Sequence, residues 1–290
     1  MQKHNIITIS ANSRLFPDSL KPLHQQVESL LCIGDTSLLS RHPALGIVGA
    51  RNMTPYGEEV TTDLTRATGR AGATIVSGLA FGIDSVAHHT AIEVKAPTIA
   101  VLPSLLPTIY PSSNYALAEK IISSGGLLVS EGSIRQRPAP YDFIRRNRII
   151  AALSDVILVT EAAAKSGSRH TVDFAFDLGK DICAVPGNIN SPLSAGTNAY
   201  INEAMAYIVT EPADILCKLG INENFIKPQF TSKIFGENAI LTALNNQKLS
   251  DSGLLEATKL TVQQLNVHLT MLEVNGAIER SPSGAWRLAT

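Results

Sequence analysis

The chain has 290 residues and a formal net charge of −1, with 44% hydrophobic and 17% charged residues. This composition supplies a sizeable hydrophobic core and excludes a generally disordered chain. The near-zero net charge also excludes a uniformly basic coat for nucleic acid, so any polyanion site has to come from a local group of cations.

The amino terminus and the cysteines indicate a cytoplasmic protein. Residues 1–10 lack the apolar core and the small-residue cleavage pattern of a secretory signal. No apolar run approaches the roughly 18 residues of a membrane-spanning helix. The three cysteines are widely spaced and form no CxxC pair. Neither a metal site nor a disulfide framework is therefore expected, and no membrane association.

Residues 1–44 show no strong periodicity and are interpreted as a short amino-terminal lead-in, with a helix around 23–31. From there to residue 219, short apolar runs alternate with segments of helical spacing. This alternation predicts an α/β domain with an extended Rossmann-like parallel sheet and helices on both faces. Strands are expected at 45–48, 73–76, 98–102, 127–129, 156–160 and 182–185, and helices at 58–70, 85–94, 115–122, 143–153 and 171–178.

The carboxyl-terminal part of the chain is predicted to be a separate small domain. Residues 220–232 are polar, contain a proline and are interpreted as a linker. Residues 233–290 show three helical patterns followed by two short apolar segments around a turn, which is a winged-helix layout. This segment contains five basic and five acidic residues, a balance that gives little support to duplex binding.

The first candidate site is Gly49-Ala50-Arg51, directly after the first predicted strand of the sheet. Glycine lets the backbone turn sharply and approach a ligand closely. The planar guanidinium of Arg51 matches the geometry of phosphate oxygens. In a parallel sheet, ligands bind beyond the carboxyl ends of the strands, so this turn is a candidate phosphate site. An ordinary turn with a surface arginine is the alternative.

A second strand-to-helix loop begins at Ser77 and Gly78 and contains two glycines. Glycine at this place again favours close approach of the backbone to a ligand. Asp84 is interpreted as the N-cap of the next helix, in preference to a catalytic carboxylate. Ser77 and Gly78 are therefore candidates for binding, whereas Asp84 is given a structural role.

The strongest cationic signal lies between residues 133 and 149, which contain five arginines, one acid and two aromatic residues. Arginine binds phosphate, and aromatic rings can stack bases without sequence preference. The alternative is that the arginines lie on a solvated helix face and that Phe143 belongs to the core. For the group as a whole we favour phosphate binding by Arg145, Arg146 and Arg148.

A fourth candidate, Ser166-Gly167-Ser168-Arg169, follows the fifth predicted strand of the sheet and opens a helix. Hydroxyl groups, a glycine and the amides of a helix N-terminus can together hold an anion. Ordinary capping by Ser168 is the alternative. The chain has no GxxxxGK[ST], GxSxG or HExxH motif, so no catalytic residue is assigned.

The segments GIVGARNMTPYG, IVSGLAFGIDSVAH, IYPSSN, FIRRNRIIAALSD and AVPGNINSPLSAGTN follow one another in the chain. Together they resemble the successive signatures of the DprA/Smf family of bacterial DNA-processing proteins, over about residues 31–216. The segment 233–290 is similar to the family's carboxyl-terminal winged-helix domain. Because few residues precede the matching region, the family's frequent amino-terminal helical domain is not expected here.

The resemblance implies a homodimeric, non-enzymatic protein without a cofactor that binds single-stranded DNA, protects it and loads RecA onto it during natural transformation. It places Arg51 in the family's G-S/A-R motif. Arg146, Asn147 and Arg148 form its RNR motif. Ser166, Gly167 and Ser168 form its SGS loop.

The chain departs from the family pattern in three places. Arg169-His170 follow the SGS loop where apolar residues are usual, and Ile144 replaces a proline. Pro103-Ser104 stand in place of a glycine-containing turn. Two other functions remain open from the sequence. One is an enzyme that binds or hydrolyses nucleotides on the same scaffold, although the PGGxGTxxE motif of related phosphoribohydrolases is missing. The other is an adaptor that senses mononucleotides.

Overall fold

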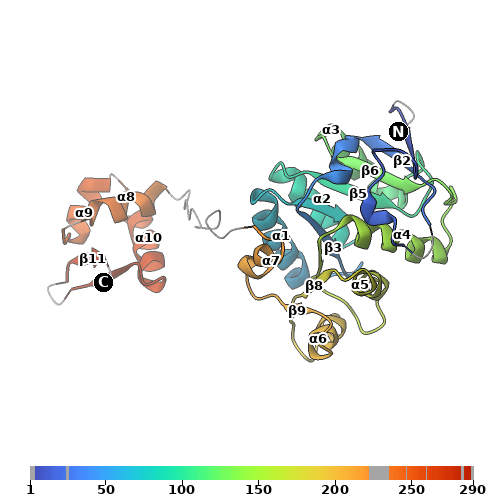
Figure 1. Cartoon of the computed structure of the whole chain (residues 1–290). Helices are drawn as coiled ribbons and strands as arrows, with labels where there is room; N and C mark the ends of the chain where they lie inside the picture. The colour runs from blue at the N-terminus through green and yellow to red at the C-terminus, as the bar shows by residue number, and fades with distance from the viewer. Residues whose placement is uncertain are drawn as a thin grey trace. The chain divides into compact units, whose positions relative to one another are not determined.

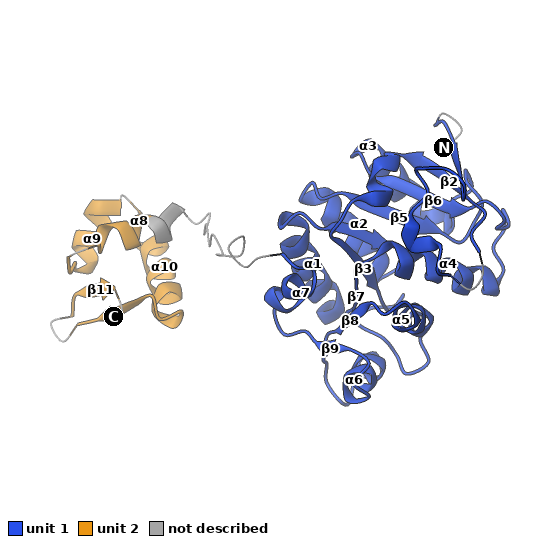
Figure 2. Ribbon diagram, in the orientation of Figure 1, with its two compact units in different colours: residues 1–225 blue, residues 226–290 orange. Residues whose placement is uncertain are grey.

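The computed structural model describes residues 4–23, 26–221, 235–245, 247–258, 260–281 and 284–288. The chain forms two compact units, residues 1–225 and 226–290 (Figure 2). Residues 222–232 of the linker expected at 220–232 lie outside the described residues. Within the described ranges, no helix combines the length and the apolar character that a bilayer crossing requires.

A nine-stranded sheet forms the centre of the larger unit (Figure 1). The strand order is β1-β2-β6-β5-β4-β3-β7-β8-β9. All pairs from β6 to β9 are parallel, whereas β2 pairs antiparallel with β6, and β1 pairs antiparallel with β2. The strands are β1 (Ile7–Ser10), β2 (Ser29–Gly34), β3 (Ala44–Val48), β4 (Thr74–Ser77), β5 (Thr98–Leu102), β6 (Leu127–Glu131), β7 (Val156–Val159), β8 (Asp181–Ala184) and β9 (Tyr207–Ile208).

The predicted α/β fold with a mostly parallel sheet is confirmed. Every residue of β3, β4, β5, β6 and β7 is buried, as expected for strands with helices on both faces. The helices of this unit are α1 (Pro55–Arg70), α2 (Ile83–Glu93), α3 (Tyr115–Ser123), α4 (Pro140–Leu153), α5 (Ser168–Asp177), α6 (Ala195–Asn202) and α7 (Pro212–Lys218), with 3₁₀ helices η1 (Asp18–Leu20), η2 (Thr36–Ser40) and η3 (Ser112–Asn114).

The amino-terminal segment differs from its interpretation as a lead-in, because β1 and β2 extend the sheet beyond β6. The helix expected around 23–31 is wrong, since β2 begins at Ser29. Leu23, Val27 and Leu30 have helical spacing and are all buried. Pairing of β2 with β6 satisfies the backbone there, and this long-range contact outweighs the local pattern.

The helices cover the two faces of the sheet in separate groups. Neighbouring residues of a strand point to opposite faces, and β3 illustrates the division. Ile47 packs in a cluster with Leu64 of α1 and Ile83 of α2. Val48 packs in another cluster, which includes Ile149 of α4 and Val172 of α5. Helices α2, α4 and α5 each follow a strand of the parallel sheet. Their amino ends therefore lie towards the carboxyl edge of these strands.

The described residues of the smaller unit form three helices and a two-stranded sheet. Its buried core gathers Leu254, Leu265, Leu269, Ile278 and Trp286. Ile240 belongs to the same cluster, so every helix and strand of the unit contributes to one core. The elements are α8 (Phe235–Ala243), α9 (Asp251–Thr258), α10 (Val262–Val274), β10 (Ile278–Arg280) and β11 (Trp286–Leu288), and the two strands pair antiparallel.

A fully buried histidine on α2 predicts a pH dependence of stability. The hydroxyl of Thr98 donates to the carbonyl of Ile75, so it accepts from Nδ1 of His88 at 2.8 Å. Burial lowers the pKa of His88 from 6.5 to about 3. Between these pH values the unfolded chain binds a proton that the folded chain does not, so stability falls as the pH is lowered.

We expect His88→Asn to lose this dependence. Between pH 6 and pH 4.5, the free energy of unfolding of the parent protein should fall by about 2 kcal/mol more than that of the variant. Urea unfolding at the two pH values measures the difference. His89→Asn, at the neighbouring exposed position, is the control and should retain most of the slope. Equal slopes for the parent and His88→Asn would contradict the assignment.

Candidate nucleic-acid interface

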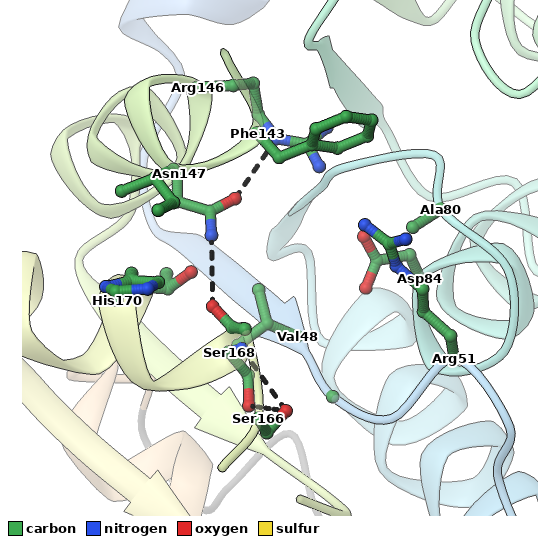
Figure 3. A pocket seen from close by; sticks show the side chains of 14 residues that line it. Val48, Arg51, Ala80, Asp84, Phe143, Arg146, Asn147, Ser166, Ser168 and His170 are labelled. Atoms are coloured by element: carbon green, nitrogen blue, oxygen red, sulfur yellow. Dashed lines mark hydrogen bonds between the residues drawn. The ribbon is translucent and has the colours of Figure 1, made fainter. Parts of the chain in front are cut away.

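A pocket of about 180 Å³ lies at the carboxyl edge of the sheet (Figure 3). Strand β3 lies between β4 and β7, and the chain crosses from β6 over to β7, so this edge is the topological switch point of the sheet. Ligands of open α/β sheets bind at such a point. We call it the switch-point pocket. It is lined by Val48, Gly49, Arg51, Ala80, Asp84, Phe143, Ile144, Arg146, Asn147, Ser166, Gly167, Ser168, His170 and Thr171.

Arg51 supplies an exposed cation at this pocket. Its guanidinium carbon lies 5.1 Å from the centre of the Phe143 ring, within the range of a cation–π contact. The Phe143 ring packs edge-on against Tyr110, with 5.4 Å between ring centres. In Figure 3 the Arg51 guanidinium and the Asp84 carboxylate lie next to each other at the pocket. Arg51 thus rests on an aromatic platform with its charge accessible.

Arg146 is a second cation in the pocket wall, but it is buried and serves the framework. Its guanidinium donates to the carbonyls of Gly78 and Val101, so α4 is tied to the carboxyl ends of β4 and β5. Burial lowers the pKa of Arg146 to about 10, against the opposing effect of Asp84. The group stays charged at neutral pH. A Cβ atom on Gly78 would lie 2.5 Å from this guanidinium, so only glycine fits there.

The loop before α5 forms the opposite wall. Asn147 of α4 donates from Nδ2 to the Gly167 carbonyl at 3.3 Å. The Ser168 hydroxyl donates to the Ser166 hydroxyl oxygen at 2.9 Å. Helix α5 begins at Ser168 with Gly167 as its N-cap. These contacts fix the loop so that hydroxyl groups and the first amides of a helix border the pocket, an arrangement suited to an anion.

The structure does not bring three of the candidate arginines to this pocket. Arg148 is 3% exposed and donates to both carboxylate oxygens of Glu131, at 2.9 and 2.8 Å. Arg145 pairs with the same carboxylate. Arg169 forms an ion pair of 2.8 Å with Asp173 and a longer one with Glu203. Acidic partners therefore hold all three.

Three further candidates, Ser77, Ala50 and Gly78, take structural places beneath the pocket. Ser77 is fully buried, and its hydroxyl donates to the Ile47 carbonyl at 2.6 Å. Ala50 is also buried and connects β3 to the loop that carries Arg51. Gly49 lines the pocket itself, whereas Gly78 lies below it against Arg146. The spacing of these residues after their strands predicted the position of the loops but not which atoms are exposed.

The prediction that Asp84 is the N-cap of α2 is wrong. The N-cap of α2 is Gly82, and the Asp84 carboxylate instead accepts from the Gly78 amide at 3.1 Å. Burial raises the pKa of Asp84, while Arg146 and Arg51 act in the opposite direction. The carboxylate lines the pocket, and both of its cations favour the charged form. His170, which the sequence marked only as a departure from the family pattern, also lines the pocket.

Within the described ranges, no group of three or more His, Cys, Asp or Glu side chains is placed to hold a metal ion.

Comparison with known protein sequences gives consistent matches. A family model described as DNA recombination-mediator protein A matches residues 6–220. Protein Smf of Escherichia coli (strain K12) is 34% identical over 297 residues, covering 99% of this chain and 79% of that protein. DNA processing protein DprA of Bacillus subtilis (strain 168) is 38% identical over 202 residues, covering 70% of this chain and 68% of that protein.

Solved structures agree with these matches. DNA processing protein A from Helicobacter pylori, whose structure is reported for its single-stranded DNA binding mode, aligns with a TM-score of 0.67 and 31% identity. The alignment covers 75% of this chain and 96% of that one. DprA from Streptococcus pneumoniae aligns with a TM-score of 0.68 and 33% identity, covering 75% of each chain.

Proposed function

The chain belongs to the DNA recombination-mediator protein A family, which includes the DprA/Smf proteins, and on this premise we propose that it binds single-stranded DNA at the switch-point pocket. The observation that carries the proposal is the juxtaposition of Arg51 with the Ser166–Gly167–Ser168 loop across one pocket. A guanidinium and loop donors on two sides suit a phosphate group that enters between them. The relative from Helicobacter pylori, reported with a single-stranded DNA binding mode, supports this choice of ligand.

The aromatic platform supports single strands over duplex DNA. Phe143 and Tyr110 lie directly behind Arg51. Unpaired bases stack on aromatic rings without sequence preference, whereas the bases of a duplex are stacked on one another. The pocket holds only about 180 Å³. This volume suits one nucleotide unit of a single strand better than it suits a duplex.

The wider role proposed for the chain follows from its family. We propose that it acts in the cytoplasm without catalysis, protects the single strand and loads RecA onto it, and works as a homodimer. The smaller unit, residues 226–290, is proposed to be a winged-helix domain with an accessory role. Its balance of acidic and basic residues favours contact with protein over contact with duplex DNA.

Fluorescence anisotropy of labelled oligo(dT) over a range of salt concentrations tests the proposal. If about four phosphates are neutralised, a fourfold rise in salt should weaken binding roughly 50-fold, since each phosphate on a single strand contributes a slope of about −0.7. A slope near zero would contradict a phosphate site. Tighter binding of mononucleotides than of oligo(dT) would favour a nucleotide-sensing or nucleotide-hydrolysing protein instead.

A further inference from the structure

A second, larger cavity of about 580 Å³ lies between α4, α5 and the segment around η1. We call it the α4–α5 groove. Its apolar walls come from Ile144 of α4, from Phe174 of α5 and from Leu178, the C-cap residue of α5. Phe174 and Leu178 pack on the main hydrophobic cluster yet remain only partly buried. The full lining is Ser19, Pro22, Leu23, Tyr141, Ile144, Arg145, Arg148, Phe174, Asp177, Leu178 and Lys180.

The groove lies next to the switch-point pocket, on the other side of α4. Ile144 lines both cavities. The residues Phe143 and Asn147 of α4 face the switch-point pocket, whereas Tyr141, Arg145 and Arg148 line the groove. Positions 141, 145 and 148 share one side of a helix because of its 3.6-residue period. Helix α4 is thus a ridge between the two cavities, and a chain that fills one can cross at Ile144 into the other.

From this geometry we propose that the α4–α5 groove receives a nucleobase of the same single strand whose phosphate lies in the switch-point pocket. The proposal rests on the function proposed above and adds a base site to it. A base has apolar faces and polar edges, and the groove matches both. Phe174, Leu178 and Ile144 offer apolar surface, and polar and charged side chains line the same groove.

Charge favours a nucleotide over a neutral apolar peptide as the occupant. The lining contains three cations, Arg145, Arg148 and Lys180, against one acid, Asp177. Glu131, which is 1% exposed, holds Arg148 and Arg145 from below. Its single negative charge balances one of the two arginines, so the groove retains a positive charge. The phosphates that flank a bound base would be attracted to this charge.

Filling the groove tests the proposal. Leu178→Trp places a large side chain in the groove from a partly buried position, and Phe176→Trp adds the same side chain on the same helix at a residue that is 60% exposed. Each variant is titrated with oligo(dT) and with an oligonucleotide of equal length whose internal positions are abasic. Urea unfolding verifies that both variants are folded.

We expect Leu178→Trp to bind oligo(dT) about 5- to 100-fold more weakly, the range of one stacked base. Its affinity for the abasic strand and its salt slope should stay unchanged, because the phosphates remain bound. Phe176→Trp should behave as the parent protein. As a second measurement, Phe174→Ala should reduce the quenching of 2-aminopurine placed in the strand, because the ring that stacks with it is removed.

Two results would overturn the base site. Leu178→Trp could bind oligo(dT) as tightly as the parent protein, which would leave the groove to another occupant such as a protein segment. It could also weaken the abasic and normal strands equally, which would mean that the groove holds backbone alone. If the parent protein bound neither strand, the function proposed above would fail, which is distinct from both results.

Discussion

Arg51→Ala is expected to weaken oligo(dT) binding by about 10- to 100-fold, the loss of one hydrogen-bonded charge, and to reduce the salt slope by about 0.7. Arg51 is exposed at the switch-point pocket and stacks on Phe143. The other cation in that wall, Arg146, is buried and donates to the carbonyls of Gly78 and Val101. Arg51 is therefore the main side chain with charge to offer a phosphate.

The control for this change is Arg70→Ala, which removes the same charge from the exposed last turn of α1. It should leave both affinity and slope close to those of the parent protein. Arg51→Lys should retain the slope, since the charge remains, but recover only part of the affinity, because an ammonium cannot form the planar double contact. Titrations in parallel over one salt series separate these outcomes. Equal losses for Arg51→Ala and Arg70→Ala would show that only net charge matters.

Glu131→Ala is expected to lower the free energy of unfolding by about 3–5 kcal/mol, the usual cost of removing one partner of a buried ion pair. Glu131 is 1% exposed and Arg148 3% exposed, and the two form a double contact. Without the carboxylate, the Arg148 guanidinium would be buried against an apolar side chain. Burial already lowers the pKa of Arg148, and Glu131 opposes that effect.

The double variant Glu131→Ala/Arg148→Met tests this explanation. It removes the charge that the single variant leaves stranded, so much of the lost stability should return. Glu58→Ala on the exposed face of α1 is the control and should change stability by less than about 0.5 kcal/mol. Urea unfolding measures all four proteins. A double variant no more stable than Glu131→Ala would mean that the carboxylate is needed for another reason.

These two experiments separate roles that the sequence placed together. The arginines at 145, 146 and 148 form one dense group in the chain, and their composition alone predicted phosphate binding for all of them. The structure assigns Arg146 to strand ends and Arg148 to Glu131. We therefore expect loss of Arg148 to act on binding through the position of α4 and the integrity of the fold.

The larger unit's sheet was predictable because its strands are short apolar runs with turn residues between them. Such patterns are local, and burial on both faces leaves little choice of structure. The loops after β3 and β7 were predictable for the same reason, since they follow those strands directly. Their meeting in one pocket follows from the parallel order of the strands at the switch point.

The parts that sequence reasoning missed depend on partners far away in the chain. The region around Leu23 and Val27 has helical spacing, yet strand β2 begins soon after it and pairs with β6, about a hundred residues later. Asp84 was expected to be the N-cap of a helix that begins at residue 85, but the helix begins two residues earlier, at Ile83. The Asp84 carboxylate instead accepts from the Gly78 amide. Neither strand β2 nor the contact of Asp84 with Gly78 could be predicted from the local sequence pattern.

The contact between Arg146 and Gly78 links two positions that lie 68 residues apart. Since the guanidinium occupies the space of a Cβ atom at position 78, either residue restricts what the other can become. The two positions are therefore expected to vary together in evolution. A larger residue at position 78 would displace the guanidinium, and the tie between α4 and the ends of β4 and β5 would then have to be made in another way.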